Sequence, residues 1–294
     1  MNPEPVSDER DAATEPPPAY DLHSHSRVSD GTLSPAALVA RAKQCRLDGL
    51  ALTDHDTTAG LARAQQAAAE HGIRLIPGVE VSVTWARATV HILGLNIDPD
   101  CRQLQAGLAA LRAERGRRAR LMGQGLEALG VGDALARAAA LGDGELVSRT
   151  HFARILVQDG RAEHPGQAVQ RYLTPGKPAY VEGQWAALDE AVRWITAAGG
   201  IAAIAHPGRY RLSNTRLKRL IETFVAVGGR ALEVVSGRHS ADQVAWFGSQ
   251  ARRFGLLASR GSDFHGPEFR GPELNAIPAL PPGLAPVWSA WDHG

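Results

Sequence analysis

The chain has 294 residues, of which 44% are hydrophobic, and its 32 basic and 31 acidic side chains give a formal net charge of +1. This balance excludes a protein that coats nucleic acid with its whole surface, and no apolar run is long enough to span a membrane. The two cysteines, Cys45 and Cys101, are too few for a disulfide framework and favour a reducing, cytoplasmic setting without a disulfide partner.

The N-terminal segment differs from the rest of the chain. Residues 1–18 are rich in proline and acidic side chains and lack an apolar signal-peptide stretch, so we expect a disordered leader. From residue 19 onward, short apolar runs alternate with helical patterns. Helices are predicted at 34–48, 57–71, 188–200, 215–229 and 241–255, and strands at 20–25, 49–54, 73–83, 88–97, 201–207, 231–236 and 256–263. This alternation indicates a parallel α/β barrel or sheet.

A long segment interrupts the alternation. Residues 99–185 are rich in Ala, Leu and Arg and helical in pattern, which predicts a helical cap inserted into a barrel formed by 19–98 and 186–275. Within it, "RAERGRRAR" at 112–120 carries five arginines and one glutamate. This stretch is either a solvated helix face or a surface that meets phosphate. The remainder, 276–294, is predicted to be a proline-rich tail.

Imidazole and carboxylate side chains recur where the predicted strands end. His23 and His25 stand one residue apart, so on a strand both rings point to the same face. The ends of parallel barrel strands converge on one face, and buried acids and imidazoles in such numbers need a compensating charge. We therefore expect a metal site with several ions. The other candidates are Asp54, His55, Asp56, His206, Asp263 and His265, which end or follow later strands, Glu80 and His91, which lie within strands, and Asp30, which follows the histidine pair.

These motifs resemble a known family. "HSH", "TDHD", "GVE", "HILG", "AHP" and "SDFH" stand in the order found in the PHP (polymerase and histidinol phosphatase) metal-dependent phosphoesterases, and the resemblance covers nearly all of residues 20–270. It implies a distorted (β/α)7 barrel with a helical cap and three divalent ions. The implied ligands are His23, His25, Glu80 and Asp263 for the first ion, Glu80, His91 and His206 for the second, and Asp30, His55 and His265 for the third.

The resemblance also implies a reaction. Cations lower the pKa of a bound water and stabilise the phosphoryl oxygens, so a metal-bridging hydroxide is the expected nucleophile. Glu80, Asp263 and His265 are the candidate catalytic residues around it. Nitrogen and oxygen ligands without sulfur suit Mn²⁺, Zn²⁺ or Fe²⁺, and the resemblance favours Mn²⁺.

Within the family the chain is most similar to the 3′,5′-nucleoside bisphosphate phosphatases, some of which are known as RNase AM. This implies removal of the 3′-phosphate from pAp-like nucleotides, leaving a nucleoside 5′-monophosphate, and degradation of short 5′-phosphorylated oligonucleotides. A bidentate arginine suits a terminal phosphate, which makes Arg149 the preferred contact. The candidate substrate-binding residues are Ser26, Arg27, Arg117, Arg118, Arg149, His151, Lys177, Arg209 and His239.

Three other functions fit parts of this pattern. A 5′–3′ exoribonuclease that trims RNA 5′ ends would need an open basic groove. A histidinol-phosphate phosphatase would need acidic groups for its cationic substrate. A structural PHP module of the kind found in polymerases would have lost ligands that this chain retains. The expected partner is a nucleotide, with short RNA or RNA 5′ ends as alternatives, and the expected state is a monomer that does not contact membranes.

Overall fold

In the part of the chain that the structure describes, seven strands form a single sheet, with neighbours in chain order from β1 to β7. The computed structural model describes residues 18–143 and 146–291. Leu22 N–H donates to the Arg260 carbonyl at 3.0 Å, which brings the two ends of the sheet together into a nearly closed barrel. The strands are β1 (Tyr20–Asp21), β2 (Gly49–Leu52), β3 (Arg74–Trp85), β4 (Ala88–Leu95), β5 (Ile201–Ile204), β6 (Ala231–Ser236) and β7 (Leu257–Gly261).

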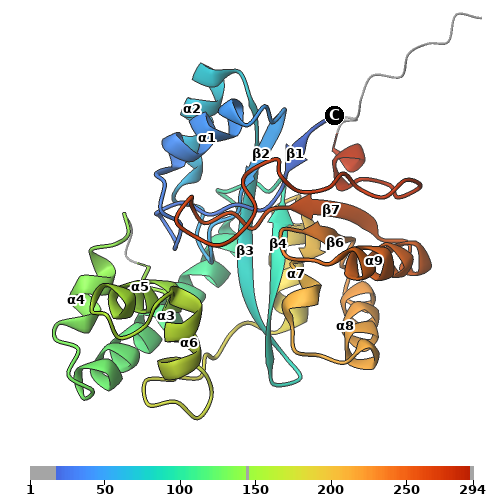
Figure 1. The fold of residues 1–294 in the computed structure, drawn as a ribbon. Helices are drawn as coiled ribbons and strands as arrows, with labels where there is room; N and C mark the ends of the chain where they lie inside the picture. The colour runs from blue at the N-terminus through green and yellow to red at the C-terminus, as the bar shows by residue number, and fades with distance from the viewer. Residues whose placement is uncertain (1–17, 144–145, 292–294) are drawn as a thin grey trace, which may run out of the picture.

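The strand β4 departs from the parallel arrangement. It pairs antiparallel with both β3 and β5, whereas the other neighbouring strands run parallel. The reason is the connection: only Ala86 and Arg87 join β3 to β4, and two residues allow a hairpin but no crossover. The expectation of a uniformly parallel sheet is therefore wrong at this strand. In Figure 1 the hairpin extends from the barrel between the helices α3–α6 on one side and α7 and α8 on the other.

Helices cover the outside of the barrel. Several begin at a serine whose hydroxyl accepts a backbone N–H in the first turn, as Ser34, Ser213 and Ser240 do. Their apolar faces pack onto the strands, and residues such as Ile195, Phe224 and Phe247 share one core with β3–β6. The helices are α1 (Pro35–Gln44), α2 (Leu61–His71), α7 (Leu188–Ala197), α8 (Asn214–Ala226) and α9 (Ala241–Phe254), with a 3-10 turn η1 (Pro207–Arg209) before α8 and another, η2 (Val287–Ala290), near the C-terminus.

The segment between β4 and α7 forms a separate helical group, which we call the insert (α3–α6). Its helices are α3 (Arg102–Glu127), α4 (Ala134–Ala139), α5 (Arg149–Gln158) and α6 (Pro165–Tyr172). The insert has its own apolar core around Phe152 and Leu156, and it lies beside the barrel in Figure 1. The long helix α3 joins the two, because Leu108 packs into the barrel core and Leu126 packs into the insert core.

The α/β barrel with a helical insertion that the sequence predicted is confirmed. The predicted leader falls almost wholly outside the described residues, which begin at Pro18. At the other end, Trp288 packs edge-on against Tyr20 with ring centroids 5.3 Å apart, so this part of the tail covers the end of the barrel near β1. Within the described residues, none of the helices has the length and apolar character that crossing a bilayer requires.

Candidate metal centre

Two histidines follow β1 and point the same way. His23 and His25 are fully buried, and their ring centroids are 5.2 Å apart. Ser24 lies between them, and its hydroxyl donates to the Ala51 carbonyl at 2.6 Å, which ties this segment to β2. The two imidazoles therefore form one fixed wall of a buried polar cluster.

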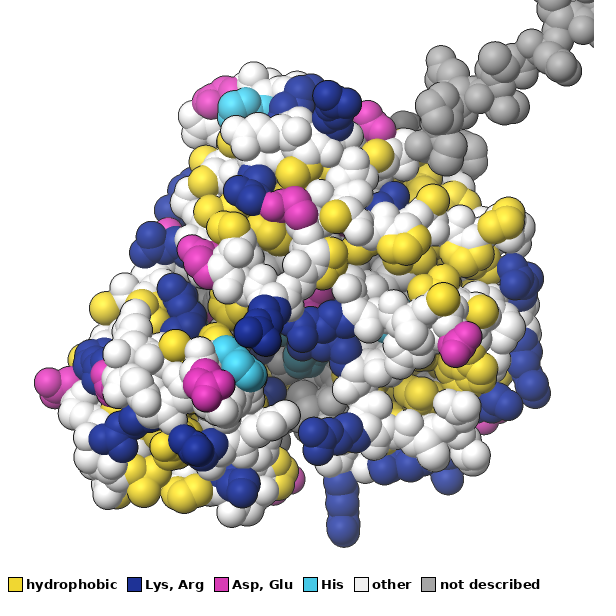
Figure 2. Space-filling model, in the orientation of Figure 1, with side chains coloured by type: hydrophobic (Ala, Val, Ile, Leu, Met, Phe, Trp, Pro, Cys, Tyr) yellow, Lys and Arg dark blue, Asp and Glu magenta, His cyan; other side chains and the backbone are white. Residues whose placement is uncertain are grey.

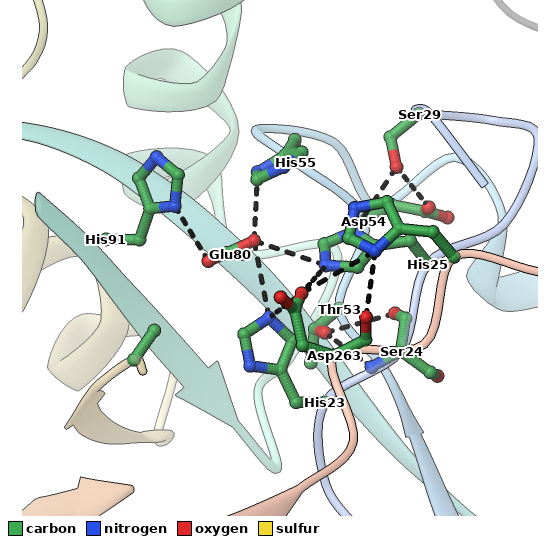
Figure 3. A network of polar contacts seen from close by, with 12 residues as sticks. His23, Ser24, His25, Ser29, Thr53, Asp54, His55, Glu80, His91 and Asp263 are labelled. Atoms are coloured by element: carbon green, nitrogen blue, oxygen red, sulfur yellow. Dashed lines mark hydrogen bonds and ion pairs between the residues drawn. The ribbon is translucent and has the colours of Figure 1, made fainter. Parts of the chain in front are cut away.

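The carboxylate of Glu80 on β3 lies at the centre of this cluster (Figure 3). Its Oε1 is 2.8 Å from Nδ1 of His91 and 2.8 Å from Nε2 of His206. Its Oε2 is 2.9 Å from Nδ1 of His55 and 3.3 Å from Nε2 of His25. Because both oxygens meet imidazole nitrogens on different sides, one carboxylate can be shared between two cations.

Two further carboxylates close the cluster. Asp263, which follows β7, places Oδ1 3.4 Å from Nε2 of His23 and 3.3 Å from Nε2 of His25. Asp30 places Oδ1 3.3 Å from Nε2 of His265. Among the described residues, three groups have ligand atoms within 4.8 Å of one another: His25, Asp30, His55 and His265; His23, His25, Glu80 and Asp263; and His55, Glu80 and His91.

All nine predicted ligand residues lie in this cluster. The group around His23 contains the four residues expected for the first ion. The set expected for the second ion, Glu80, His91 and His206, differs from the observed group, which contains His55 in place of His206. His206 still contacts Glu80 directly. The ligand sets remain predictions, and the geometry places their atoms within reach of shared cations.

Unsatisfied polar atoms test whether cations fit here. Nε2 of His23, Nε2 of His25, Oδ1 of Asp30 and Oε2 of Glu80 are all buried and lack a hydrogen-bond partner of acceptable geometry within the described residues. Such atoms cost free energy unless something satisfies them. A donor set of imidazole nitrogens and carboxylate oxygens without sulfur suits Mn²⁺, Fe²⁺ or Zn²⁺. The residues therefore fit divalent cations.

The electrostatics of the cluster keep its carboxylates ionised. Burial opposes this, but His55, His91 and His23 hold the pKa of Glu80 well below its usual range. Burial also works against ionised Asp263, and Arg209 is the largest of the influences that lower its pKa. An ionised carboxylate is the form that binds a cation.

Backbone strain marks two of these residues. His206 has φ 27° and Asp263 has φ 56°, backbone angles that residues other than glycine rarely adopt. Holding such a backbone costs free energy and is typical of functional positions. The fold therefore maintains His206 and Asp263 in place at a cost.

Glu233 and Asp54 support the cluster from behind, and the sequence reading missed this role for both. Glu233 on β6 is fully buried; its Oε1 is 3.0 Å from Nδ1 of His23, and its other oxygen accepts the backbone N–H of His206. Asp54 accepts Ser26 N–H at 2.8 Å and the Ser29 hydroxyl at 2.6 Å, which fixes the loop that carries Asp30. A glutamate inside the apolar run "ALEVVS" is the signal that could have identified Glu233.

Asp56 joins the barrel to the insert rather than entering the cluster. Its Oδ2 accepts Nε of Arg115 on α3 at 2.6 Å, and Arg115 also donates to the Ser82 hydroxyl at 2.8 Å. Arg115 is only 7% exposed. We call this buried pair the Asp56–Arg115 link. It lies where α3 passes from the barrel core to the insert core, so it fixes the insert against the cluster.

A cleft of about 770 Å³ opens beside the cluster, between the barrel and the insert. Asp30, His55, His91, His206, Asp263 and His265 reach it from the cluster, and Arg115, Arg118, Arg149 and Arg209 reach it from the insert and from η1. Figure 2 shows the hollow with basic side chains gathered around it. Burial and the like charges of Arg115 and Arg149 lower the pKa of Arg118 to about 10, so these arginines crowd one another. We call Arg115, Arg118 and Arg149 the arginine wall.

The predicted substrate-binding residues divide into two sets. Arg118, Arg149 and Arg209 line the cleft. The other six are absent from its described lining. Three of them bind carboxylates: Ser26 donates to Asp54, Arg27 pairs with Asp143, and Arg117 pairs with Glu114. Of the rest, Lys177 is exposed, His151 accepts Ser148 N–H at the start of α5, and His239 contacts the Val234 carbonyl and Gly208 N–H. Local partners hold most of these six residues, and their assignment to substrate stays a prediction.

Comparisons with known proteins point the same way as the geometry. The sequence model of the PHP domain matches residues 21–140. The chain is 51% identical to a 3′,5′-nucleoside bisphosphate phosphatase of Chromobacterium violaceum, over 91% of this chain and 94% of that protein. It is 45% identical to a 5′-3′ exoribonuclease of Haemophilus influenzae, over 92% and 97% respectively.

Solved structures add a similar fold. An amidohydrolase from Chromobacterium violaceum, solved with bound sulfate and no metal, superposes with a TM-score of 0.89 at 50% identity and covers 92% of this chain and 95% of its own. A protein from Bifidobacterium adolescentis assigned as a metal-dependent phosphoesterase gives a TM-score of 0.81 at 29% identity, over 94% and 95%.

Proposed function

This chain belongs to the PHP family of metal-dependent phosphoesterases, and from that premise we propose that it removes the 3′-phosphate from nucleoside 3′,5′-bisphosphates. The observation that carries the proposal is the arginine wall, which faces the metal-ligand cluster across one cleft. A substrate with two phosphates needs two such places, one for the phosphate that is cleaved and one for the phosphate that is kept.

The kept 5′-phosphate fits the insert side of the cleft. Arg149 is the first residue of α5, and Ser148 and Thr150 beside it also line the cleft. A helix N-terminus offers backbone N–H groups and a favourable dipole to an anion, and a guanidinium adds paired hydrogen bonds. Burial and the nearby Arg115 and Arg209 lower the pKa of Arg149, although Tyr180 and Asp30 oppose this, so its positive charge has no full counter-charge. A phosphate would supply it.

The cleaved 3′-phosphate fits the cluster side. We propose three divalent ions there, Mn²⁺ in preference to Zn²⁺ or Fe²⁺, held by the nine residues named above. Bound cations of this kind activate water and neutralise phosphoryl oxygens. The chain's own contribution is positional: Glu233 orients His23, and Ser148 donates to Asp30 at 3.1 Å, so the N-terminus of α5 is tied to the ligand cluster.

Arg209 lies where the two halves of the cleft meet. Its guanidinium is paired with Oδ2 of Asp263, and that carboxylate is the strongest influence raising the pKa of Arg209. A fixed positive charge beside the cluster can also bind an oxygen of the phosphate being cleaved, so we propose Arg209 as a contact to the scissile group.

The lining of the cleft also bears on two alternative functions. A histidinol-phosphate phosphatase would need acids for a cationic substrate, but the only carboxylates in the described lining of the cleft are Asp30 and Asp263, both in the cluster. A 5′–3′ exoribonuclease is the stronger second candidate, because the cleft continues past the cluster. In addition, relatives from Haemophilus influenzae and Escherichia coli are named as 5′-3′ exoribonucleases. We further propose a monomer in a reducing compartment, the cytoplasm, since Cys45 and Cys101 are both free.

The test compares pAp, histidinol phosphate, a 5′-phosphorylated RNA oligomer and an aryl phosphate as substrates with Mn²⁺. We expect pAp to be hydrolysed most efficiently. The Arg149→Ala variant should lose about 30-fold in kcat/KM for pAp, as for a lost charged hydrogen bond, and little for the aryl phosphate. Arg193→Ala, an exposed substitution on α7, is the matched control. Equal losses for both substrates would remove Arg149 from recognition, and preference for histidinol phosphate would overturn the proposed function.

A further inference from the structure

The cleft extends beyond the cluster to a region that a nucleoside bisphosphate does not need. Its far end is lined by the tip of the β3–β4 hairpin, residues 86–89, and by the segment that leads into α8. That end carries three arginines, Arg87, Arg211 and Arg216, which we call the distal arginines. Since the carboxylates of the described lining lie in the cluster, the charged side chains of the described lining at the far end are all basic.

The hairpin tip is held in an unusual conformation. Ala86 has φ 45° and Arg87 has φ 66°, so both residues of the two-residue turn adopt the left-handed region. Such turns favour Asn-Gly, because glycine pays no steric cost at positive φ and Asn tolerates it better than most residues with a Cβ. Arg216 donates to the Ala86 carbonyl at 3.0 Å and so fastens the tip to α8. The turn therefore keeps a long cationic side chain at the edge of the cleft where glycine would be less strained.

The distal arginines also have charge to offer a ligand. Within residues 18–143 and 146–291, neither Arg87 nor Arg211 forms an ion pair with a carboxylate. Tyr210, next to Arg211 in the chain, is held in place through its hydroxyl, which donates to the Ala205 carbonyl at 2.8 Å and accepts His91 N–H at 2.8 Å. Guanidinium groups that lack a carboxylate partner bind phosphate, and contacts to the phosphate backbone carry no sequence information.

We propose that the distal arginines form a second phosphate subsite, which binds the phosphate one nucleotide to the 3′ side of the cleaved one in a 5′-phosphorylated oligoribonucleotide. This proposal rests on the proposed function, because it places the 5′-phosphate at the arginine wall and the cleaved phosphate at the cluster. The ligand class is an RNA of at least three nucleotides, bound without regard to sequence.

The same bond is then broken in both kinds of substrate. Hydroxide from water attacks the phosphorus that follows the first nucleotide, and the bond from phosphorus to the 3′-oxygen breaks. The 3′-oxygen takes up a proton, so a nucleoside 5′-monophosphate is released. With pAp the other product is inorganic phosphate; with an oligonucleotide it is the shortened chain carrying a new 5′-phosphate, which can bind again.

The experiment uses a length series, pAp, pApA and pApApA, and measures initial release of AMP with Mn²⁺. The variants are Arg87→Ala, Arg211→Ala and their combination, and Arg219→Ala on the exposed face of α8 is the matched control. We expect kcat/KM for pApApA to fall about tenfold for each arginine removed, with pAp and the control within about twofold of the native protein. The salt dependence of kcat/KM for pApApA should also become shallower in the double variant.

A second readout does not depend on catalysis. Calorimetric titration with chelator present compares pApApA with AMP, and the native protein should bind pApApA more tightly by a margin that the double variant loses. Equal losses for pAp and pApApA, or no loss for either, would overturn the subsite. Hydrolysis of pAp without any length effect would overturn the subsite and leave the proposed function standing. If pAp is not hydrolysed, but the native protein binds pApApA more tightly than AMP and the double variant does not, the proposed function fails and the subsite stands.

Discussion

The metal-ligand cluster and the arginine wall face each other across one cleft, but they are positioned in different ways. Most of the cluster residues follow short strands, and the barrel itself brings these strand ends together. The arginine wall lies on α3 and α5, whose position depends on how a separate helical core packs against the barrel. On the proposed function, the barrel therefore fixes the groups that carry out cleavage, whereas the packing of the insert positions the groups that select the substrate.

The largest expected effect breaks the cluster side alone. Asp263→Asn removes a ligand charge and should lower kcat for pAp by at least about 1,000-fold, because several kcal/mol of transition-state stabilisation depend on the cations. His206→Ala should act in the same direction. Initial rates with Mn²⁺, metal content and circular dichroism check this, with the exposed Asp242→Asn as control. Full activity in Asp263→Asn would contradict the assignment of this cluster.

The second prediction concerns the Asp56–Arg115 link, which joins the barrel to the insert. Asp56→Ala leaves Arg115 buried without its partner and should lower the free energy of unfolding by about 3–5 kcal/mol. The matched control is Asp189→Ala, which breaks an exposed pair with Arg193 and should cost less than about 1 kcal/mol. Urea unfolding measures both. If the two variants lose equally little stability, the Asp56–Arg115 link does not hold the insert.

The third prediction concerns support behind the cluster. Glu233→Gln keeps the size of the side chain but weakens its hold on His23 and on the His206 backbone, and should reduce metal affinity by about 10–100-fold. Titration with Mn²⁺ measures the affinity directly. At saturating Mn²⁺ most of the activity should return, and a loss that excess metal does not restore would contradict a positioning role.

The smallest effect distinguishes neighbours on α3. Arg118→Ala should raise KM for pAp about tenfold, because Arg118 lines the cleft. Arg117→Ala should change KM less than about twofold, because Arg117 pairs with Glu114 outside it. Steady-state kinetics on the two variants measure KM directly. Similar changes in KM would contradict the placement of Arg118 in the cleft and of Arg117 outside it.

These contrasts show how far the sequence could be read. The cluster residues stand in short motifs beside strand ends, so local pattern placed them near one another. Arg118 and Arg149 were candidate phosphate contacts from the sequence, but the sequence could not place them opposite the cluster, because they approach it only through the packing of the insert. Even so, a signal for Arg115 was present: α3 buries Leu108, Leu111, Ala119 and Met122, and Arg115 continues that helical spacing. An arginine at a buried position indicates a partner, here Asp56.

The antiparallel strand β4 is a further lesson. His91 does not follow the end of a parallel strand; it reaches the cluster from within β4, opposite Ser82 on β3. The two strands predicted at 73–83 and 88–97 leave only residues 84–87 between them, and a connection this short excludes a crossover. Turn length, rather than the alternation of strands and helices, was the informative feature at this point.

The hairpin turn at Ala86 and Arg87 has a consequence for engineering and for natural variation. Asn-Gly at these two positions would relieve the left-handed backbone and make the protein more resistant to heat. The same exchange would delete a guanidinium at the edge of the cleft. A search for thermostable variants should therefore enrich this substitution, and the enzymes obtained should lose processing of longer RNA while they keep their action on mononucleotides.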